Sequence, residues 1–145
     1  NGICQTPGSG KIACGYFVST TLRDAGLKLN RYDLAKLYSH AICKNTCSNI
    51  QKYNNLDSLI GYIHTQPNDI YIVGLDNHVG YLIKEHNIVF FVHSNYLGQG
   101  CVTKELAIHS EALKGSNLYV LGSLLKNKSI LNKWRNKETV LILKN

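Results

Sequence analysis

The sequence predicts an α+β domain, with helices in its first half and an antiparallel sheet in its second. The first half carries apolar side chains at helical spacing, as in Phe17, Val18, Thr21, Leu22 and Ala25. After Pro67 the apolar residues instead alternate with polar ones or form short continuous runs, as strands do. Helices followed along the chain by strands are typical of α+β domains rather than of alternating α/β folds.

Each element has its own local signal. We expect helices over 14–25, 32–40 and 56–64, the first closed by Gly26 and the second capped by Asn30. We expect strands over 70–75, 78–83 and 88–93, with the polar residues 84–87 as a hairpin turn. Two later strands, 118–121 and 140–143, and a short helix over 129–134 complete the prediction.

Length and charge favour one domain over residues 1–145, without a membrane span. The chain has 145 residues, of which 44% are hydrophobic, and a chain of about 150 residues buries roughly 68–70% of its unfolded surface. No apolar run approaches the ~18–20 residues that cross a bilayer. Sixteen Lys and Arg against nine Asp and Glu give a net charge of +7, which favours anionic surroundings. Because no nucleic-acid motif is recognisable, nucleic acid is not an expected partner.

Cys14 is the first residue that could carry chemistry, because it lies where a loop meets the first helix. The positive end of a helix lowers the pKa of a thiol, and the thiolate is the nucleophile. Cys14 also shares a helix face with Val18, Thr21 and Ala25, so we expect it to face the sheet. The alternative is a buried structural cysteine or a disulfide with Cys4.

Two histidines lie on the predicted hairpin. If 84–87 form the turn, Ile83 pairs with Ile88 and His78 lies opposite His93. Directly opposed side chains lie on one face, so the two imidazoles would touch, with Cys14 packed beside them. A satisfied polar pair or a two-histidine metal site is the competing interpretation.

A row of Cys, His and His divides the work of acyl transfer. Cys14 would attack a carbonyl, His78 would act as base, and His93 would orient the imidazole of His78. The backbone N–H of Cys14 would bind the oxyanion, with Gln5 as a candidate side-chain donor. Tyr16 and Tyr96, which are adjacent to this centre in the sequence, are candidates to line the substrate cleft.

Four segments resemble motifs of the NlpC/P60 cysteine peptidases. Residues 12–18 are similar to the family's nucleophile motif, in which a cysteine and small residues open the first helix. Residues 67–73 resemble the strand that follows, 78–83 resemble the His-Val-Gly block with the base, and 89–94 resemble the strand that ends in the third polar residue.

The resemblance implies a papain-like α+β fold and thiol-dependent hydrolysis of amide bonds in peptidoglycan peptides. By position it makes Cys14 the nucleophile, His78 the base and His93 the orienting residue. Bacterial amidases, secreted antibacterial effectors and lysins all fit, and an effector would have an immunity or inhibitor protein as partner. Other thiol chemistry on the same fold, such as deamidation or acyl transfer, and a non-enzymatic binding module are the alternatives.

The remaining cysteines suggest an exported protein. Five cysteines are many for a small domain in a reducing compartment, so we expect a secreted or periplasmic location. Without Cys14, three pairings are open to Cys4, Cys43, Cys47 and Cys101, and Cys43 could pair with Cys47 if a helix ends between them. His40, Cys43 and Cys47 also have metal-like spacing, but no fourth ligand is evident, so neither metal nor cofactor is expected.

One further motif lies near the C-terminus. Trp134 is flanked by Lys133, Arg135 and Lys137. It could stack on a base or a sugar, or it could anchor an amphipathic helix to the core.

Overall fold

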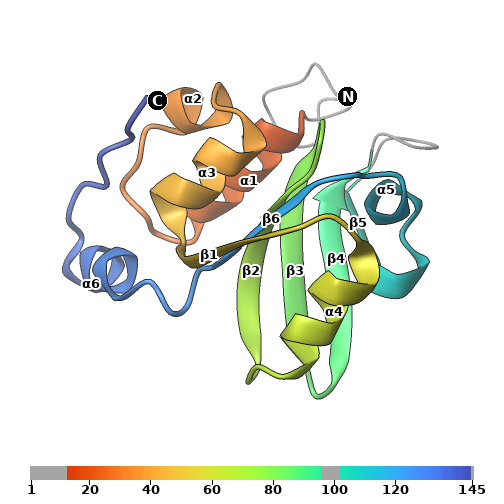
Figure 1. Cartoon of the computed structure of the whole chain (residues 1–145). Coiled ribbons are helices and arrows are strands. Elements are labelled where there is room, and N and C mark those ends of the chain that lie inside the picture. Colours follow the sequence, from red (N-terminus) through yellow and green to blue (C-terminus); the bar gives the residue numbers. More distant parts are fainter. Residues whose placement is uncertain (1–12, 96–101, 145) are drawn as a thin grey trace.

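A six-stranded antiparallel sheet forms the centre of the protein. The computed structural model describes residues 13–95 and 102–144, and its sheet has the strand order β1-β6-β2-β3-β4-β5 (Figure 1). The strands are β1 (Ser48–Tyr53), β2 (Asp69–Gly74), β3 (Val79–Glu85), β4 (Ile88–Ser94), β5 (Val102–Leu106) and β6 (Tyr119–Ser123). The prediction of helices combined with an antiparallel sheet is therefore confirmed.

Helices cover both faces of this sheet. They are α1 (Cys14–Asp24), α2 (Arg31–Ala35), α3 (Ser39–Thr46), α4 (Leu56–His64), the 3-10 turn η1 (Ala107–His109), α5 (Glu111–Lys114) and α6 (Lys128–Asn136). No helix in the described part of the chain is long and apolar enough to cross a membrane.

The alternation of side chains along the strands creates two apolar cores. Ile72 and Tyr81 face α1 and α3, together with Val18 and Ile42. Their strand neighbours face the opposite side, where Tyr71, Leu82 and Phe91 pack against Leu59 and Ile63 of α4 and against η1 and α5. Since successive residues of a strand point to opposite faces, one set of strands supplies both cores.

The helix expected over 32–40 is wrong, because the chain leaves the helical conformation after Ala35. Asn30 caps α2 as predicted, accepting from the backbone N–H groups of Tyr32 and Asp33. Tyr38 is extended (φ −63°, ψ 154°), and a new helix, α3, begins at Ser39. The break lets α2 pack on α1 while α3 packs on β2 and β6, so tertiary packing overrides a continuous helical pattern.

The strand expected over 140–143 is also absent. Thr139 forms one isolated bridge with Lys28, and Val140 donates to the Lys28 carbonyl. The Asn45 side chain then bonds both the N–H and the C=O of Leu143. The segment is therefore held by helix and loop residues on the surface, with Leu141 and Leu143 exposed.

Candidate active site

Helix α1 begins near the upper end of the sheet in Figure 1, and Cys14 is its first residue. Ala13 is the extended N-cap residue, and Cys14 is the first helical residue. Alanine has no side-chain acceptor, so the N–H groups of the first turn are not capped by the residue before them. Next to the thiol, Gly15 lets α2 approach closely, because a Cβ on it would lie 2.6 Å from the Ala35 carbonyl oxygen.

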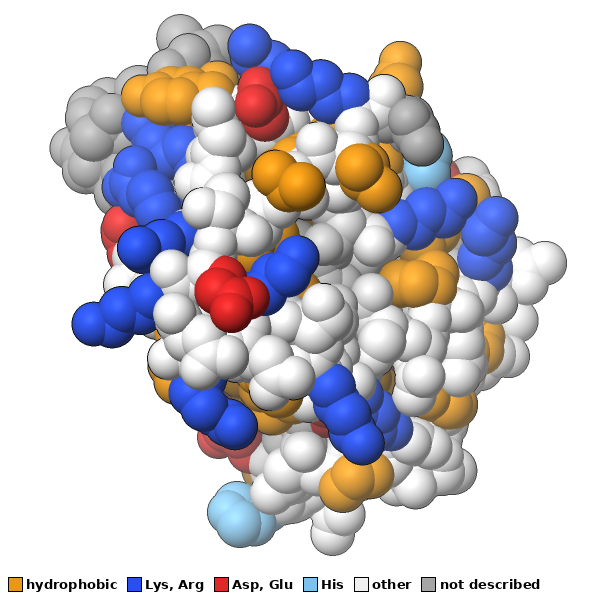
Figure 2. Space-filling model, turned by 90° about the vertical axis from the view of Figure 1, so that its left-hand side faces the viewer, with side chains coloured by type: hydrophobic (Ala, Val, Ile, Leu, Met, Phe, Trp, Pro, Cys, Tyr) orange, Lys and Arg blue, Asp and Glu red, His pale blue; other side chains and the backbone are white. Residues whose placement is uncertain are grey.

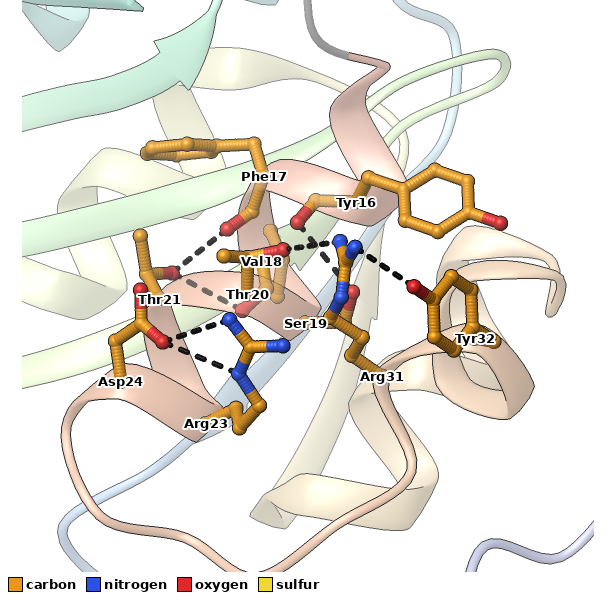
Figure 3. A network of polar contacts seen from close by, with 10 residues as sticks. All are labelled: Tyr16, Phe17, Val18, Ser19, Thr20, Thr21, Arg23, Asp24, Arg31 and Tyr32. Atoms are coloured by element: carbon orange, nitrogen blue, oxygen red, sulfur yellow. Dashed lines mark hydrogen bonds and ion pairs between the residues drawn. The ribbon is translucent and has the colours of Figure 1, made fainter. Parts of the chain in front are cut away.

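A buried arginine fixes α1 against α2. The Arg31 guanidinium donates to Thr20 Oγ1 at 3.0 Å and to the Tyr32 hydroxyl at 3.1 Å (Figure 3). It also lies over the rings of Tyr32 and Tyr16, at 4.5 and 5.5 Å from their centroids. Tyr16 itself packs edge-on against Tyr32, so this network stabilises the first turns of the helix that carries Cys14.

The loop between β2 and β3 carries His78 and is tied to its surroundings on two sides. Within the loop, Leu75 N–H donates to the His78 carbonyl at 2.8 Å. Ser39 Oγ, at the start of α3, donates to the Leu75 carbonyl at 2.9 Å. The Asp76 carboxylate accepts from the backbone N–H groups of Asn117 and Leu118 at 2.9 and 3.0 Å. These bonds fix the backbone that positions the His78 ring.

His78, His93 and Glu105 form a chain of hydrogen bonds. His78 Nε2 lies 2.9 Å from His93 Nδ1, and His93 Nε2 lies 2.6 Å from Glu105 Oε2. His93 is completely buried and His78 nearly so, whereas the Glu105 side chain is about a quarter exposed. The predicted contact between the two imidazoles is therefore present.

The predicted register of the hairpin is wrong by two residues. Ile83 pairs with Phe90, and Glu85 pairs with Ile88. The turn is only His86 and Asn87, whose φ values of 47° and 70° fit a two-residue hairpin turn. A shift by two residues keeps every side chain on its face. His78 thus reaches His93 diagonally, across Gly80.

The Glu105 carboxylate, which ends this series of hydrogen bonds, determines which nitrogen of each imidazole carries a proton. A carboxylate oxygen only accepts, so His93 carries its proton on Nε2 and leaves Nδ1 as an acceptor. His78 must then donate from Nε2, which makes its Nδ1 the basic nitrogen. The arrangement thus selects one tautomer for each imidazole.

Cys14 and His78 line one cavity of about 510 Å³. Tyr38 and His40 contribute from one side, with their rings stacked in parallel. Asp76 and Leu118 contribute from another. Tyr16 is not among the described residues that line this cavity, since its ring packs against Arg31 and Tyr32. The candidates Gln5 and Tyr96 lie outside the described residues.

The expectation of a lowered thiol pKa is wrong for Cys14. Burial raises the pKa of the Cys14 thiol, and the nearby backbone N–H groups of Val79, Gly15 and Cys14 oppose this only in part. Burial and the neighbouring His93 lower the pKa of His78 to about 3. Burial also lowers the pKa of His93, although Glu105 opposes the shift. At neutral pH the site therefore combines a neutral thiol with a neutral imidazole.

Cys43 and Cys47 are free, buried thiols, so the expected disulfides that include them are not formed. Helix α3 continues from Cys43 through Thr46 and ends there, with Cys47 as its extended C-cap residue, yet the two thiols do not pair. Cys43 Sγ lies 3.5 Å from the carbonyl oxygens of Ile72 and Val120. Among the described residues, no group of three potential ligands could hold a metal ion. Cys4 and Cys101 lie outside the described residues.

Glu105 is the residue that the sequence analysis missed. It lies on β5, an edge strand with no buried residue, so the apolar pattern that reveals inner strands is absent. The signal that could have found it is the alternation of Thr103 and Glu105, which places both side chains on the face of His93.

No family model, curated protein or solved structure matches the chain.

Proposed function

We propose that the protein is a cysteine-dependent hydrolase of amide bonds. Cys14 is the nucleophile, His78 the general base, and His93 and Glu105 are positioning residues. The observation that carries this proposal is the buried chain from Glu105 through His93 to His78, which ends at the cavity that Cys14 also lines. A base oriented by a second and third group beside a thiol is the arrangement that nucleophilic catalysis requires.

In the first step, Cys14 Sγ attacks the carbonyl carbon while His78 Nδ1 accepts the thiol proton. Because the resting thiol and imidazole are both neutral, the proton moves during the attack. The resulting oxyanion is stabilised by the backbone N–H groups at the start of α1. The developing imidazolium is stabilised through His93 by the Glu105 carboxylate. His78 then gives its proton to the leaving amine, and the C–N bond breaks to leave a thioester on Cys14.

The second step reverses the roles of base and acid. His78 takes a proton from a water molecule, which attacks the thioester carbon. The proton returns to the sulfur as the C–S bond breaks, which releases the carboxylic acid and regenerates the neutral thiol. One base therefore serves both halves of the reaction.

The proposed substrates are the peptides of bacterial peptidoglycan, which implies an exported protein. The resemblance of residues 12–18, 67–73, 78–83 and 89–94 to the NlpC/P60 peptidases, and hence a papain-like fold, supports this choice. The net charge of +7 favours an encounter with an anionic cell wall.

Digestion of purified peptidoglycan tests the proposal, with released fragments read by mass spectrometry. The wild type should release new fragments whose masses identify the bond, and Cys14→Ala and His78→Ala should release none. His86→Ala, which changes an exposed histidine in the hairpin turn, is the matched control and should behave like the wild type. Unchanged activity of Cys14→Ala would refute the proposal.

The raised pKa of Cys14 favours the second candidate, a binding module with a structural thiol. In either case a raised pKa predicts that iodoacetamide alkylates the Cys14 thiol slowly at pH 6, and that the alkylation rate still rises above pH 8.5. A plateau near neutral pH would instead mean a preformed thiolate–imidazolium pair. The module differs from the enzyme in two results: Cys14→Ala would lose stability, and no amide substrate would be cleaved.

A further inference from the structure

An apolar cavity lies at the end of α1 remote from the candidate active site. It has a volume of about 250 Å³ and is lined by apolar side chains alone. Those that matter here are Leu22, Ala25, Leu27, Leu125, Leu131 and Trp134. The 11 residues of α1 separate it from Cys14 by about 16 Å of helix, so the proposed chemistry makes no use of it.

Trp134 lines this cavity and is held in place. Its indole N–H donates to the Ala25 carbonyl at 2.8 Å. Its ring edge lies over Gly26, where a Cβ would come within 2.9 Å of the indole nitrogen. Nevertheless 49% of Trp134 is exposed, as is 44% of Leu125, which also lines the cavity. Two large apolar side chains are thus presented to solvent around an apolar hollow.

The segment that carries Leu125 and Trp134 is rich in positive charge, and Glu138 is the first acid after it. Residues 125–137 contain five cations and no acid: Lys126, Lys128, Lys133, Arg135 and Lys137. Within the described residues, none of the five forms an ion pair with a carboxylate. Figure 2 shows this side of the molecule, where Lys and Arg side chains are spread across the surface with apolar side chains and some acidic ones between them.

An apolar cavity beside a cluster of cations fits a partner that is anionic at its surface and apolar beneath. An acyl chain needs no hydrogen bonds, and the apolar lining offers none. A nucleic-acid base or a peptide backbone would instead bring polar groups that lose their hydration without a partner. A tryptophan with its N–H satisfied and its ring half exposed, beside lysines, is typical of side chains at a membrane–water interface.

We propose that the surface formed by Leu125, Trp134 and the five cations of 126–137 docks on an anionic phospholipid bilayer. Leu125 and Trp134 enter the acyl region, and the lysines and Arg135 contact the headgroup phosphates. This docking is independent of the proposed hydrolase activity, so the Cys14→Ala protein should bind the bilayer as well as the wild type does.

The single tryptophan of the chain makes the test direct. The full chain is titrated with phosphatidylcholine vesicles that contain or lack phosphatidylglycerol, at about 0.15 M salt, where the Debye length is ~8 Å. We expect a blue shift of Trp134 emission, and quenching by brominated acyl chains, with the anionic vesicles only. Vesicle sedimentation supplies the affinity.

Matched variants separate charge from insertion. Lys133→Gln with Arg135→Gln should weaken binding roughly 25-fold, since each cation near an anionic surface contributes about fivefold. Lys104→Gln with Lys114→Gln, on β5 and α5, removes the same charge elsewhere and should change binding less than twofold. Leu125→Ser should abolish most of the quenching by bromolipids, while Ile108→Ser, at a somewhat more exposed apolar position on η1, should not.

Three results would overturn the proposal. One is equal binding to vesicles with and without phosphatidylglycerol, and another is sedimentation with anionic vesicles without any blue shift or quenching. The third is an equal blue shift with double-stranded DNA, which would make the surface a nucleic-acid site.

Discussion

Glu105 controls the protons of the two buried imidazoles, although it is remote from Cys14 in the chain. Its carboxylate accepts from His93 Nε2 at 2.6 Å. Without a fixed acceptor there, His93 could move its proton to Nδ1, and two donors would then face each other between His93 and His78. His78 would relieve this by moving its own proton to Nδ1, which would then no longer be the basic nitrogen.

We therefore predict that Glu105→Gln lowers kcat/KM about 10²-fold, the lower end of what a general base contributes. The amide can still accept a hydrogen bond, but its neutral charge no longer stabilises the imidazolium in the transition state. Steady-state kinetics measure the loss, and the acid limb of the pH profile should also move. Glu111→Gln, on the exposed surface of α5, is the control, and an equal loss in both variants would contradict a positioning role.

The pH dependence of stability follows from the same buried imidazoles. His78 has a pKa of about 3 in the folded protein because of burial and the neighbouring His93, against ~6.5 in the unfolded chain. Between these values the unfolded chain binds the proton and the folded state does not. The free energy of unfolding should therefore fall as the pH is lowered from about 6.5 towards 3.

Thermal unfolding at a series of pH values measures this fall. His78→Asn should flatten the curve between pH 6 and 4, whereas His86→Asn in the exposed turn should leave its slope unchanged. A wild-type Tm that stays constant down to pH 4 would show that the imidazoles accept protons in the folded state.

At the scale of the elements, Gly80 makes room for the hydrogen-bonded chain of His78, His93 and Glu105 where β3 pairs with β4. A Cβ at position 80 would lie 2.9 Å from His93 Cβ and 2.8 Å from the Phe91 ring. Phe91 in turn stacks on the His93 ring at 4.1 Å between centroids. The His93 ring therefore has no space to tolerate even one added methyl group.

Gly80→Ala should lower both activity and stability, with a cost of about 1–3 kcal/mol for overpacking. Gly61→Ala is the matched control, because nothing lies within 4 Å of its added Cβ and the residue is in the middle of α4. That substitution should stabilise the protein by up to ~1 kcal/mol through helix propensity and leave activity intact. Denaturant unfolding and kinetics on both variants decide the matter, and a fully active Gly80→Ala enzyme would contradict the role of His93.

Elements with a strong local signal could be predicted from the sequence. The helix over 56–64 and the strands expected over 70–75, 78–83 and 88–93 are present within one or two residues of their predicted bounds, since their apolar residues recur at the right period. β1 and β5 could not, because edge strands bury few side chains and carry polar residues on both faces. Because β5 was not predicted, Glu105 was not predicted as a site residue either.

The contact between the two histidines could be predicted from the sequence, but the hairpin register and the pKa of Cys14 could not. The contact of His78 with His93 survived a wrong register only because the error was an even number of residues. The pKa of Cys14 was not predictable from its place at a helix start, since that place says nothing about burial. The split between α2 and α3 likewise depends on packing against α1 and the sheet, which no local pattern contains.

At the scale of the whole molecule, one sheet connects the two apolar cores. Tyr71 and Ile72 are neighbours in β2, yet each belongs to a different core. Unfolding of the strands on behalf of one core therefore exposes the apolar residues of the other core to solvent. The domain should therefore unfold in a single cooperative transition.

Ile63→Ala tests this coupling because Ile63 is fully buried in the core beneath α4, whereas Trp134 lies beyond the other face, beside α1. The substitution should cost about 2–5 kcal/mol. Unfolding in urea is followed by circular dichroism for the whole sheet and by fluorescence for Trp134. Both midpoints should fall by the same amount, with unchanged slopes, because the two cores share their strands. If the fluorescence midpoint stayed where it is in the wild type, the helices around Trp134 would unfold as a separate unit.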